Sequence, residues 1–397
     1  MFILCLLSLG ACGPAPEPGS ESGDGAEANR SSDRAGFADL GAAGQGYAHA
    51  SPATELVFPE DHGPHPDFRI EWWYLTANLE DENGEPLGMQ WTLFRQAQQP
   101  KAPAAGTNTV GQANTDPWAA DQLWMAHMAL SRGERHRVAE RFARGTREPL
   151  PDAAQQAGVT ARPFRAWLDD WRLESLTTAA GGDALDKLML TAQAEDEKGP
   201  FGYQLKLEAD GPLVRHGING FSQKSADGQG SMYYSQPFYR VSGEVWLNGE
   251  RVAVSGRAWL DREWSSQLLS AGQTGWDWFS LHLDSGARLM VFRLRGGGEN
   301  HDDYLSGSWI TPDGEVSPLN TDAFTLVPQA FATASGHRVP VRWRLTLPDQ
   351  NLELEITARH ANRWMNTSVP YWEGAVGVTD AVSGAPRGQG YLEMTGY

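Results

Sequence analysis

The chain has 397 residues, 16 of them tryptophan, and 10% of it is aromatic, which is enough for two globular units with substantial cores. Its formal net charge of -18 argues against a nucleic-acid partner, because phosphate recognition needs a basic face. A largely disordered chain and a DNA- or RNA-binding protein are therefore both disfavoured.

Residues 1–11 read as a lipoprotein signal peptide. The apolar run MFILCLLSLGAC ends in Leu9-Gly10-Ala11-Cys12, which has the small residues before cysteine that a lipoprotein signal peptidase needs. We expect residues 1–11 to be removed and Cys12 to be acylated; a buried amino-terminal strand is the alternative. Gly13 follows the cysteine, and the lack of aspartate there is similar to Gram-negative lipoproteins that continue to the outer membrane, facing the periplasm.

Residues 12–50 read as the acylated cysteine and a disordered tether. They are rich in Gly, Ala, Pro, Ser, Glu and Asp and bury too little to offset the entropy of ordering. No other apolar run approaches the ~20 residues that span a bilayer. The lipid on Cys12 is therefore the predicted contact with the membrane.

Residues 51–236 are predicted to form a first domain of strands and turns. In 71–79, Trp73 and Leu75 share one face while Trp72 and Tyr74 share the other. His127 is either a hydrogen-bonded core histidine or a ligand-contacting residue. Further strands are expected at 87–95, 124–131, 164–175, 188–194 and 201–209.

Residues 237–397 are predicted to form a second domain, again without a long helical period. Asn248-Gly249 is a two-residue hairpin signal. Strands are expected at 240–247, 252–261, 304–311, 341–347, 352–358, 371–378 and 390–395. Repeated strands with glycine turns predict an all-β class of sandwich or barrel type.

Carboxylates and tryptophans are concentrated at strand spacing in residues 256–295. Trp259, Asp261 and Glu263 share one face of an extended strand, and Trp276 and Trp278 share a face of the next. A buried carboxylate needs a partner or a proton. The two acids therefore either bond neighbouring arginines or backbone amides, or include a neutral acid whose pKa an apolar pocket raises.

Several common catalytic patterns are missing from the sequence. It has no Gly-x-Ser-x-Gly nucleophile elbow, HExxH helix, paired Cys-x-x-Cys, calcium loop, phosphate loop or Rossmann glycine pattern. The sequence thus predicts no metal and no cofactor, and it supports no hydrolase nucleophile.

Residues 256–295, together with HPDFRIEWWYLTANL, WMAHMALS, YYSQPFYRVSG, YWEGAV and GYLEMTGY, resemble the carotenoid 1,2-hydratase and AttH-like lipocalin-domain family over about residues 55–397. The resemblance implies two lipocalin-like β-barrel domains packed together. It also matches Asp261 to the proton donor proposed for those hydratases. Trp259, Met232 and Tyr234 depart from the family pattern, since the hydratases tend to have tyrosine, histidine and tryptophan there.

Two functions remain open. The AttH-like resemblance implies an envelope lipoprotein that binds an apolar or lipid-like ligand in a barrel cavity. An ABC transporter permease is then the expected partner, which gives or receives the ligand. The alternative is a hydratase- or cyclase-like enzyme for an apolar polyene or terpenoid, with Asp261 as general acid and Glu263 as second candidate. The residues expected to contact the ligand are Trp72, Tyr74, His127, Tyr233, Tyr234, Trp259, Trp276, Trp278 and Glu373.

Overall fold

The computed structural model describes residues 44–101, 120–146, 155–177, 182–247, 249–297 and 302–397, which belong to one compact unit, Gly36–Tyr397. These residues form two β-sheets, and their one helical element is the 3-10 helix η2 (Glu60–His62). In this part of the chain no helix is long and apolar enough to cross a membrane. The predicted signal peptide, Cys12 and most of the tether lie outside the described residues.

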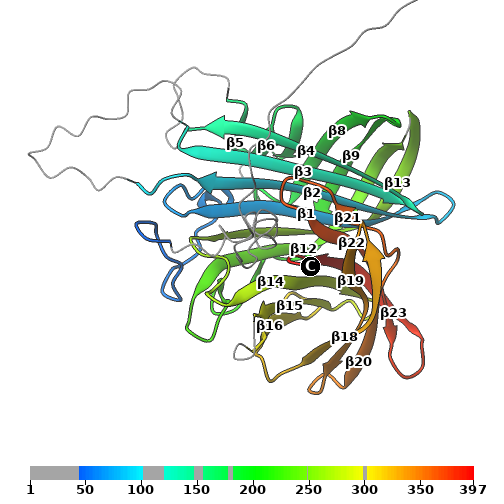
Figure 1. Cartoon of the computed structure of the whole chain (residues 1–397). Coiled ribbons are helices and arrows are strands. Elements are labelled where there is room, and N and C mark those ends of the chain that lie inside the picture. The colour runs from blue at the N-terminus through cyan, green and yellow to red at the C-terminus, as the bar shows by residue number, and fades with distance from the viewer. Residues whose placement is uncertain (1–43, 102–119, 147–154, 178–181, 248, 298–301) are drawn as a thin grey trace, which may run out of the picture. The chain divides into compact units, whose positions relative to one another are not determined.

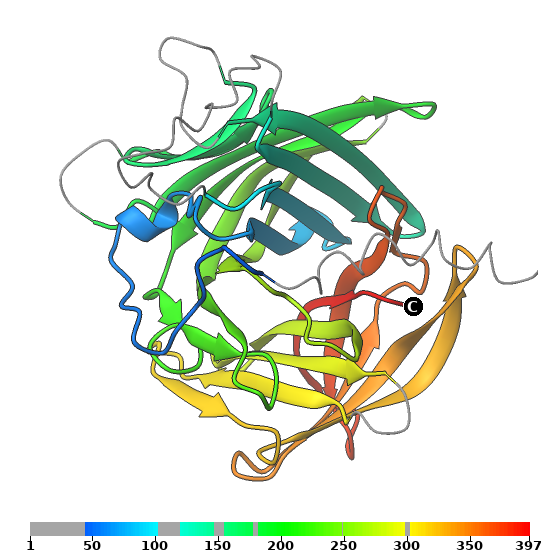
Figure 2. The same cartoon turned by 60° about the vertical axis from the view of Figure 1, so that its left-hand side comes forward.

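The first sheet curls around an apolar core (Figures 1 and 2). Two short strands, β10 (Val214–Arg215) and β11 (Phe221–Gln223), pair with its strand β12. The remaining order across the sheet is β4 (Arg135–Gly145), β3 (Gln122–Arg132), β2 (Pro86–Ala97), β1 (Ile70–Asp81), β13 (Glu250–Ser265), β12 (Gly230–Leu247), β9 (Gly199–Ala209), β8 (Lys187–Asp196), β7 (Trp171–Ser175), β6 (Phe164–Leu168) and β5 (Ala157–Ala161).

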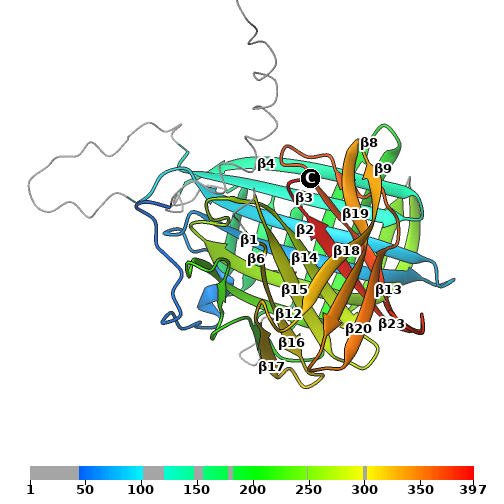
Figure 3. The same ribbon diagram turned by 60° about the horizontal axis from the view of Figure 1, so that its bottom comes forward.

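The second sheet curls around a core of its own (Figure 3). The short strand β21 (Trp364–Met365) pairs with its strand β22. The remaining order is β17 (Val316–Leu319), β16 (Tyr304–Ile310), β15 (Arg288–Gly296), β14 (Gln273–Leu283), β23 (Pro386–Met394), β22 (Tyr371–Asp380), β20 (Leu352–Ala358), β19 (His337–Leu347) and β18 (Thr325–Ala334).

Strand alternation decides which side chains enter each core. Trp73 and Leu75 of β1 lie in the core of the first sheet, and Phe279 and Leu281 of β14 lie in the core of the second. The residues between them along each strand point to the other face. The predicted all-β class with two curled sheets is confirmed.

The chain changes from the first sheet to the second between residues 265 and 273. The division expected at residues 236 and 237 instead falls inside β12, which continues to Leu247. Pro237, which cannot donate a ladder hydrogen bond, sits where the register with β13 shifts between Gln236 and Tyr239. The proline therefore produces a β-bulge within the strand instead of ending it.

Two further differences concern single strands. The segment 164–175 forms a hairpin, β6 and β7, because Asp169 adopts a positive φ of 54° and the chain reverses there. The apolar pattern does not predict strand β4, with the sequence RHRVAERFARG, since charged residues interrupt that pattern. It is nevertheless paired along its whole length with β3.

Candidate functional site

Aromatic residues from both sheets meet in a third apolar cluster, which we call the intersheet cluster. It contains residues on the outer faces of β1, β12, β13, β14 and β15. Trp72 and Trp276 pack against it and keep part of their surfaces exposed. Its aromatic members include Tyr74, Tyr233, Trp259, Trp278 and Phe292.

Asp261 lies beside this cluster and is 2% exposed. Its Oδ1 accepts hydrogen bonds from the Ser235 hydroxyl and, over 2.7 Å, from Trp259 Nε1. Burial raises the pKa of Asp261 to about 7, against the hydrogen bonds from Ser235, Trp259 and Tyr233, and the charge of Glu263 adds to the rise. Because Oδ1 accepts two bonds, the proton of the neutral acid belongs on Oδ2.

A neutral histidine connects Asp261 to the second sheet. His216 is fully buried, and this burial lowers its pKa to about 3. Ser235 gives its one hydroxyl proton to Asp261, so it accepts from His216 Nε2 over 2.7 Å. His216 Nδ1 then accepts from the hydroxyl of Ser308 in β16 over 2.9 Å. The orientation of Asp261 therefore depends on residues from both sheets.

Glu263 differs from Asp261 in having a cation as its partner. Its Oε1 lies 2.9 Å from Lys224 Nζ and accepts a hydrogen bond from the Ser231 hydroxyl. The same ammonium group lies 4.2 Å from the ring centre of Phe292 and 5.0 Å from that of Tyr233. Glu263 is therefore held as one member of a largely buried ion pair.

Two further carboxyl groups reach the cluster from the second sheet. Glu373 of β22, 2% exposed, accepts the hydroxyl of Tyr74 on Oε1. Glu393 of β23 accepts Trp276 Nε1 over 2.6 Å. Burial raises the pKa of Glu373 well above its ordinary value and that of Glu393 to about 7. Glu393 keeps part of its surface exposed, but its carboxyl lies among buried groups.

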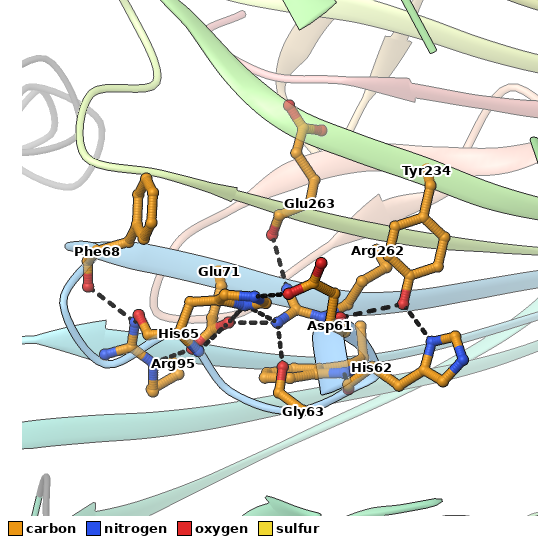
Figure 4. Close-up of polar contacts among 11 residues, drawn as sticks. Asp61, His62, Gly63, His65, Phe68, Glu71, Arg95, Tyr234, Arg262 and Glu263 are labelled. Carbon is orange, nitrogen blue, oxygen red and sulfur yellow. Dashed lines mark hydrogen bonds and ion pairs between the residues drawn. The ribbon is translucent and has the colours of Figure 1, made fainter. Parts of the chain in front are cut away.

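The opposite face of β13 carries a separate ionic network at one end of the first core. Figure 4 shows Arg262 bonded to Glu71, and Tyr234 turned toward His62. Glu71 is fully buried and also binds Arg95. The ion pair of Asp261 with Arg262 that the sequence left open is thus not formed among the described residues, because alternation turns the two side chains apart.

The structure gathers most of the residues that the sequence singled out. Asp261, Glu263 and Glu373 lie at or beside the intersheet cluster with the aromatic residues Trp72, Tyr74, Tyr233, Trp259, Trp276 and Trp278. His127 is connected to Glu373 only indirectly. Its Nδ1 lies 3.0 Å from the Tyr371 hydroxyl, and Tyr371 interacts with Glu373. Tyr234 belongs to the first core, where its hydroxyl lies 2.7 Å from His62 Nδ1.

Sequence reasoning missed Glu393, His216, Ser235 and Lys224. Glu393 stands in the run GYLEMTGY, where its two-residue spacing from Tyr391 and Thr395 places the three side chains on one face of a strand. His216 and Lys224 lie next to the short strands β10 and β11, outside any long alternating pattern. Their positions depend on how that segment folds over β12.

The arrangement is suited to proton transfer in an apolar environment. Asp261 presents an acidic proton next to aromatic faces, and its partners Ser235, Trp259 and Tyr233 are neutral. A carboxylic acid kept neutral by its surroundings can act as a general acid near pH 7. In the part of the chain that the structure describes, no three His, Cys, Asp or Glu side chains are grouped to hold a metal ion.

Comparisons with known proteins agree with the fold. A family model described as AttH-like matches residues 49–397. The crystal structure of a protein described as AttH, from Nitrosomonas europaea, is 33% identical, with a TM-score of 0.72 over 88% of this chain and 99% of that one. No curated protein matches the sequence.

Two more distant structures share the fold alone. Kievitone hydratase from Nectria haematococca is 14% identical, with a TM-score of 0.58 over 88% of this chain and 96% of that one. CghA, solved with Sch210972, is 12% identical, with a TM-score of 0.50 over 89% of this chain and 97% of that one.

Proposed function

Because this chain belongs to the AttH-like family, we propose that it is an enzyme of hydratase or cyclase type that protonates an apolar unsaturated molecule. The intersheet cluster holds the substrate, and Asp261 is the general acid. The observation that carries the proposal is a buried carboxyl group whose pKa is raised to about 7 beside the rings of Trp259 and Tyr233.

The reaction begins with the proton on Asp261 Oδ2. This proton adds to one carbon of a carbon–carbon double bond, and the adjacent carbon becomes a cation while Asp261 becomes a carboxylate. The electron-rich faces of Trp259 and Trp278 stabilise the cation. Water then adds and loses a proton to a carboxylate, which completes hydration; attack by a second double bond and loss of a proton completes cyclisation.

The fold is compatible with this chemistry. Kievitone hydratase is a hydratase by name and shares the fold, although fold alone never establishes an activity. The argument for this chain therefore rests on Asp261 and its neighbours. The hydrogen bonds from Ser235 and Trp259 fix the carboxyl group, and such fixed geometry is what a general acid requires.

A second candidate function is binding without turnover. Trp72, Trp276 and Tyr304 are partly exposed at the intersheet cluster, so an apolar or lipid-like molecule can reach these rings from solvent. In this version the protein is an acylated envelope lipoprotein that catalyses no reaction and exchanges its ligand with an ABC transporter permease. Both versions share the binding step and differ in whether product forms.

The test is turnover with defined polyenes. Purified full-length protein is incubated with lycopene, squalene or geranylgeraniol in D2O, and products are analysed by mass spectrometry. We expect a product carrying one deuterium at the protonated carbon, with an added water if the reaction is hydration. Asp261→Asn should abolish product while leaving quenching of tryptophan emission by the polyene within a few-fold.

The exposed turn residue Asp313 provides the matched control. Asp313→Asn makes the same chemical change away from the cluster and should leave turnover unchanged. Product formation by a folded Asp261→Asn protein would exclude Asp261 and make Glu263 the next residue to test. Saturable quenching without product from any polyene would instead favour the binding protein.

A further inference from the structure

Glu373 and Glu393 form a carboxyl pair in the second sheet. They are directly opposite each other on the antiparallel strands β22 and β23. Like charges at such positions repel, and two close buried carboxyl groups cannot both ionise easily. The charge of Glu393 is accordingly one cause of the raised pKa of Glu373, after burial itself. The pair therefore retains a proton at neutral pH.

Tyr74 of the first sheet connects the two acids. Its hydroxyl donates to Glu373 Oε1 and also interacts with Glu393. The other oxygen of Glu373, Oε2, is buried and has no hydrogen-bond partner of ordinary geometry among the described residues. The Tyr371 hydroxyl interacts with the same carboxyl group. A protonated Oε2 can therefore donate toward Tyr371.

Tyr371 continues a line of polar groups toward the surface. Its hydroxyl lies 3.0 Å from His127 Nδ1, and His127 Nε2 lies 3.1 Å from Glu140 Oε1. A carboxylate can only accept, so Nε2 carries the hydrogen and Nδ1 accepts from Tyr371. The Ser368 backbone N–H and hydroxyl hold Glu140 in place over 2.9 and 2.8 Å.

Of the two carboxyl groups at the ends of this line, the more exposed one is also the more acidic. The Glu140 side chain is 19% exposed, that of His127 is 1% exposed, and Glu373 is 2% exposed. Burial raises the pKa of Glu140, but hydrogen bonds from His127 and Ser368 outweigh it and lower the pKa below its ordinary value. Burial lowers the pKa of His127. Glu140 is thus an ionised group at the solvent end of a neutral chain.

We propose that Glu373 and Glu393 are a second acid–base centre of the intersheet site, and that Tyr371, His127 and Glu140 exchange the proton of this pair with solvent. The catalytic use of the pair rests on the proposed function, whereas the exchange path does not. Asp261 would act from the first sheet, and the carboxyl pair from the second.

The transfer moves one proton from Glu373 to Glu140 in effect, and the total number of protons stays the same. Glu373 gives its proton to the Tyr371 oxygen, the Tyr371 hydroxyl proton moves to His127 Nδ1, and the Nε2 proton moves to the Glu140 carboxylate. Glu373 is then ionised, Glu140 is neutral, and His127 is in its other neutral tautomer. Glu140 releases the proton to water, and the reverse sequence reloads the pair.

Other titratable groups surround Glu373 without extending this line. Tyr203 of β9 and Tyr391 of β23 interact with it electrostatically. Tyr203 donates its hydroxyl to the backbone oxygen of Gln90 over 2.8 Å. Tyr203 therefore provides a matched control, since it is a buried phenol near the same carboxyl group, but its hydroxyl bonds Gln90 and not His127.

The test follows hydrogen–deuterium exchange at protonated carboxyl groups by infrared spectroscopy and needs no substrate. Full-length protein is transferred into D2O, and the shift of the carboxylic C=O stretch is timed; Glu373→Gln and Asp261→Asn identify the bands. We expect His127→Gln and Tyr371→Phe to slow exchange at Glu373 by about 100-fold, the lower bound for transfer by a positioned side chain.

Tyr203→Phe should leave the exchange rate within a few-fold, and urea unfolding of every variant reports structural damage separately. If a variant unfolds, Glu140→Gln applies the same test at the surface, since glutamine can bond His127 but cannot accept its proton. Wild-type exchange rates in both His127→Gln and Glu140→Gln would overturn the relay. Slowed exchange in a protein without turnover would retain the relay and reject the proposed enzyme.

Discussion

Asp261 and Glu71 lie on neighbouring strands but face opposite ways, and their surroundings give them opposite protonation behaviour. Glu71 is bound by Arg95 and Arg262, and although burial opposes them these charges hold its pKa well below the ordinary value. Burial raises the pKa of Asp261 from 3.8 to about 7. Glu71 therefore stabilises the folded protein in its charged form, whereas ionisation of Asp261 destabilises the folded protein.

We predict that Asp261→Asn makes stability less sensitive to alkali. The folded protein binds the Asp261 proton more tightly than the unfolded chain does, so this stabilisation is complete below pH 3.8 and is lost as the pH rises to about 7. Between about pH 4 and about pH 8, urea unfolding should show a loss that is smaller by a few kcal/mol in the variant, at about 1.4 kcal/mol per pKa unit.

Glu71→Gln should behave in the opposite way. It leaves two arginines without their buried counter-charge, which costs about 3–5 kcal/mol at neutral pH. The difference from wild type should shrink below pH 4.5, the ordinary pKa of glutamate, because wild-type Glu71 then loses stabilisation as the pH falls through its lowered pKa. An equal loss in Asp261→Asn at neutral pH would favour a structural ion pair for Asp261.

At the scale of elements, close backbone contact positions β23 against β14. A Cβ atom on Gly390 would lie 2.1 Å from the Ser280 backbone oxygen, and the Gly390 carbonyl also accepts Asn78 Nδ2 of the first sheet over 3.1 Å. We predict that Gly390→Ala destabilises the protein by about 1–3 kcal/mol, the usual cost of overpacking. Gly377→Ala in β22, where nothing lies within 4 Å of the new Cβ, should be nearly neutral in the same denaturation assay.

At the scale of the whole molecule, the amino-terminal sequence predicts where the protein is located. We predict that the mature chain begins at an acylated Cys12, because LGAC precedes a segment with little to bury. Intact-mass analysis of protein from the native envelope should show loss of residues 1–11 and addition of lipid, and Cys12→Ser should release the protein from membranes. A mass that retains Met1, or one without lipid, would contradict the anchor and the outer-membrane proposal.

Local pattern was sufficient for much of the fold. Alternation in β1, β13 and β14 predicted which side chains share a face, including Asp261 with Trp259, and the structure agrees. It did not predict β4, because charged residues interrupt the apolar alternation of that strand although it pairs with β3. It also did not predict that β12 continues past Pro237. Both features depend on pairing with a neighbouring strand, and the sequence of a single strand does not show which strand pairs with it.

The sequence by itself determined the class of the fold, the family and the outward faces of the strands, because periodicity and long motifs are local properties of the chain. Only the tertiary structure decided that Asp261 and the Glu373–Glu393 pair belong to one cluster, since residues over a hundred positions apart meet there across two sheets. Burial and hydrogen-bond or charge partners also shifted the pKa values of Asp261 and Glu71 in opposite directions. A pKa is set by desolvation and neighbouring charges, and both exist only once the sheets have packed.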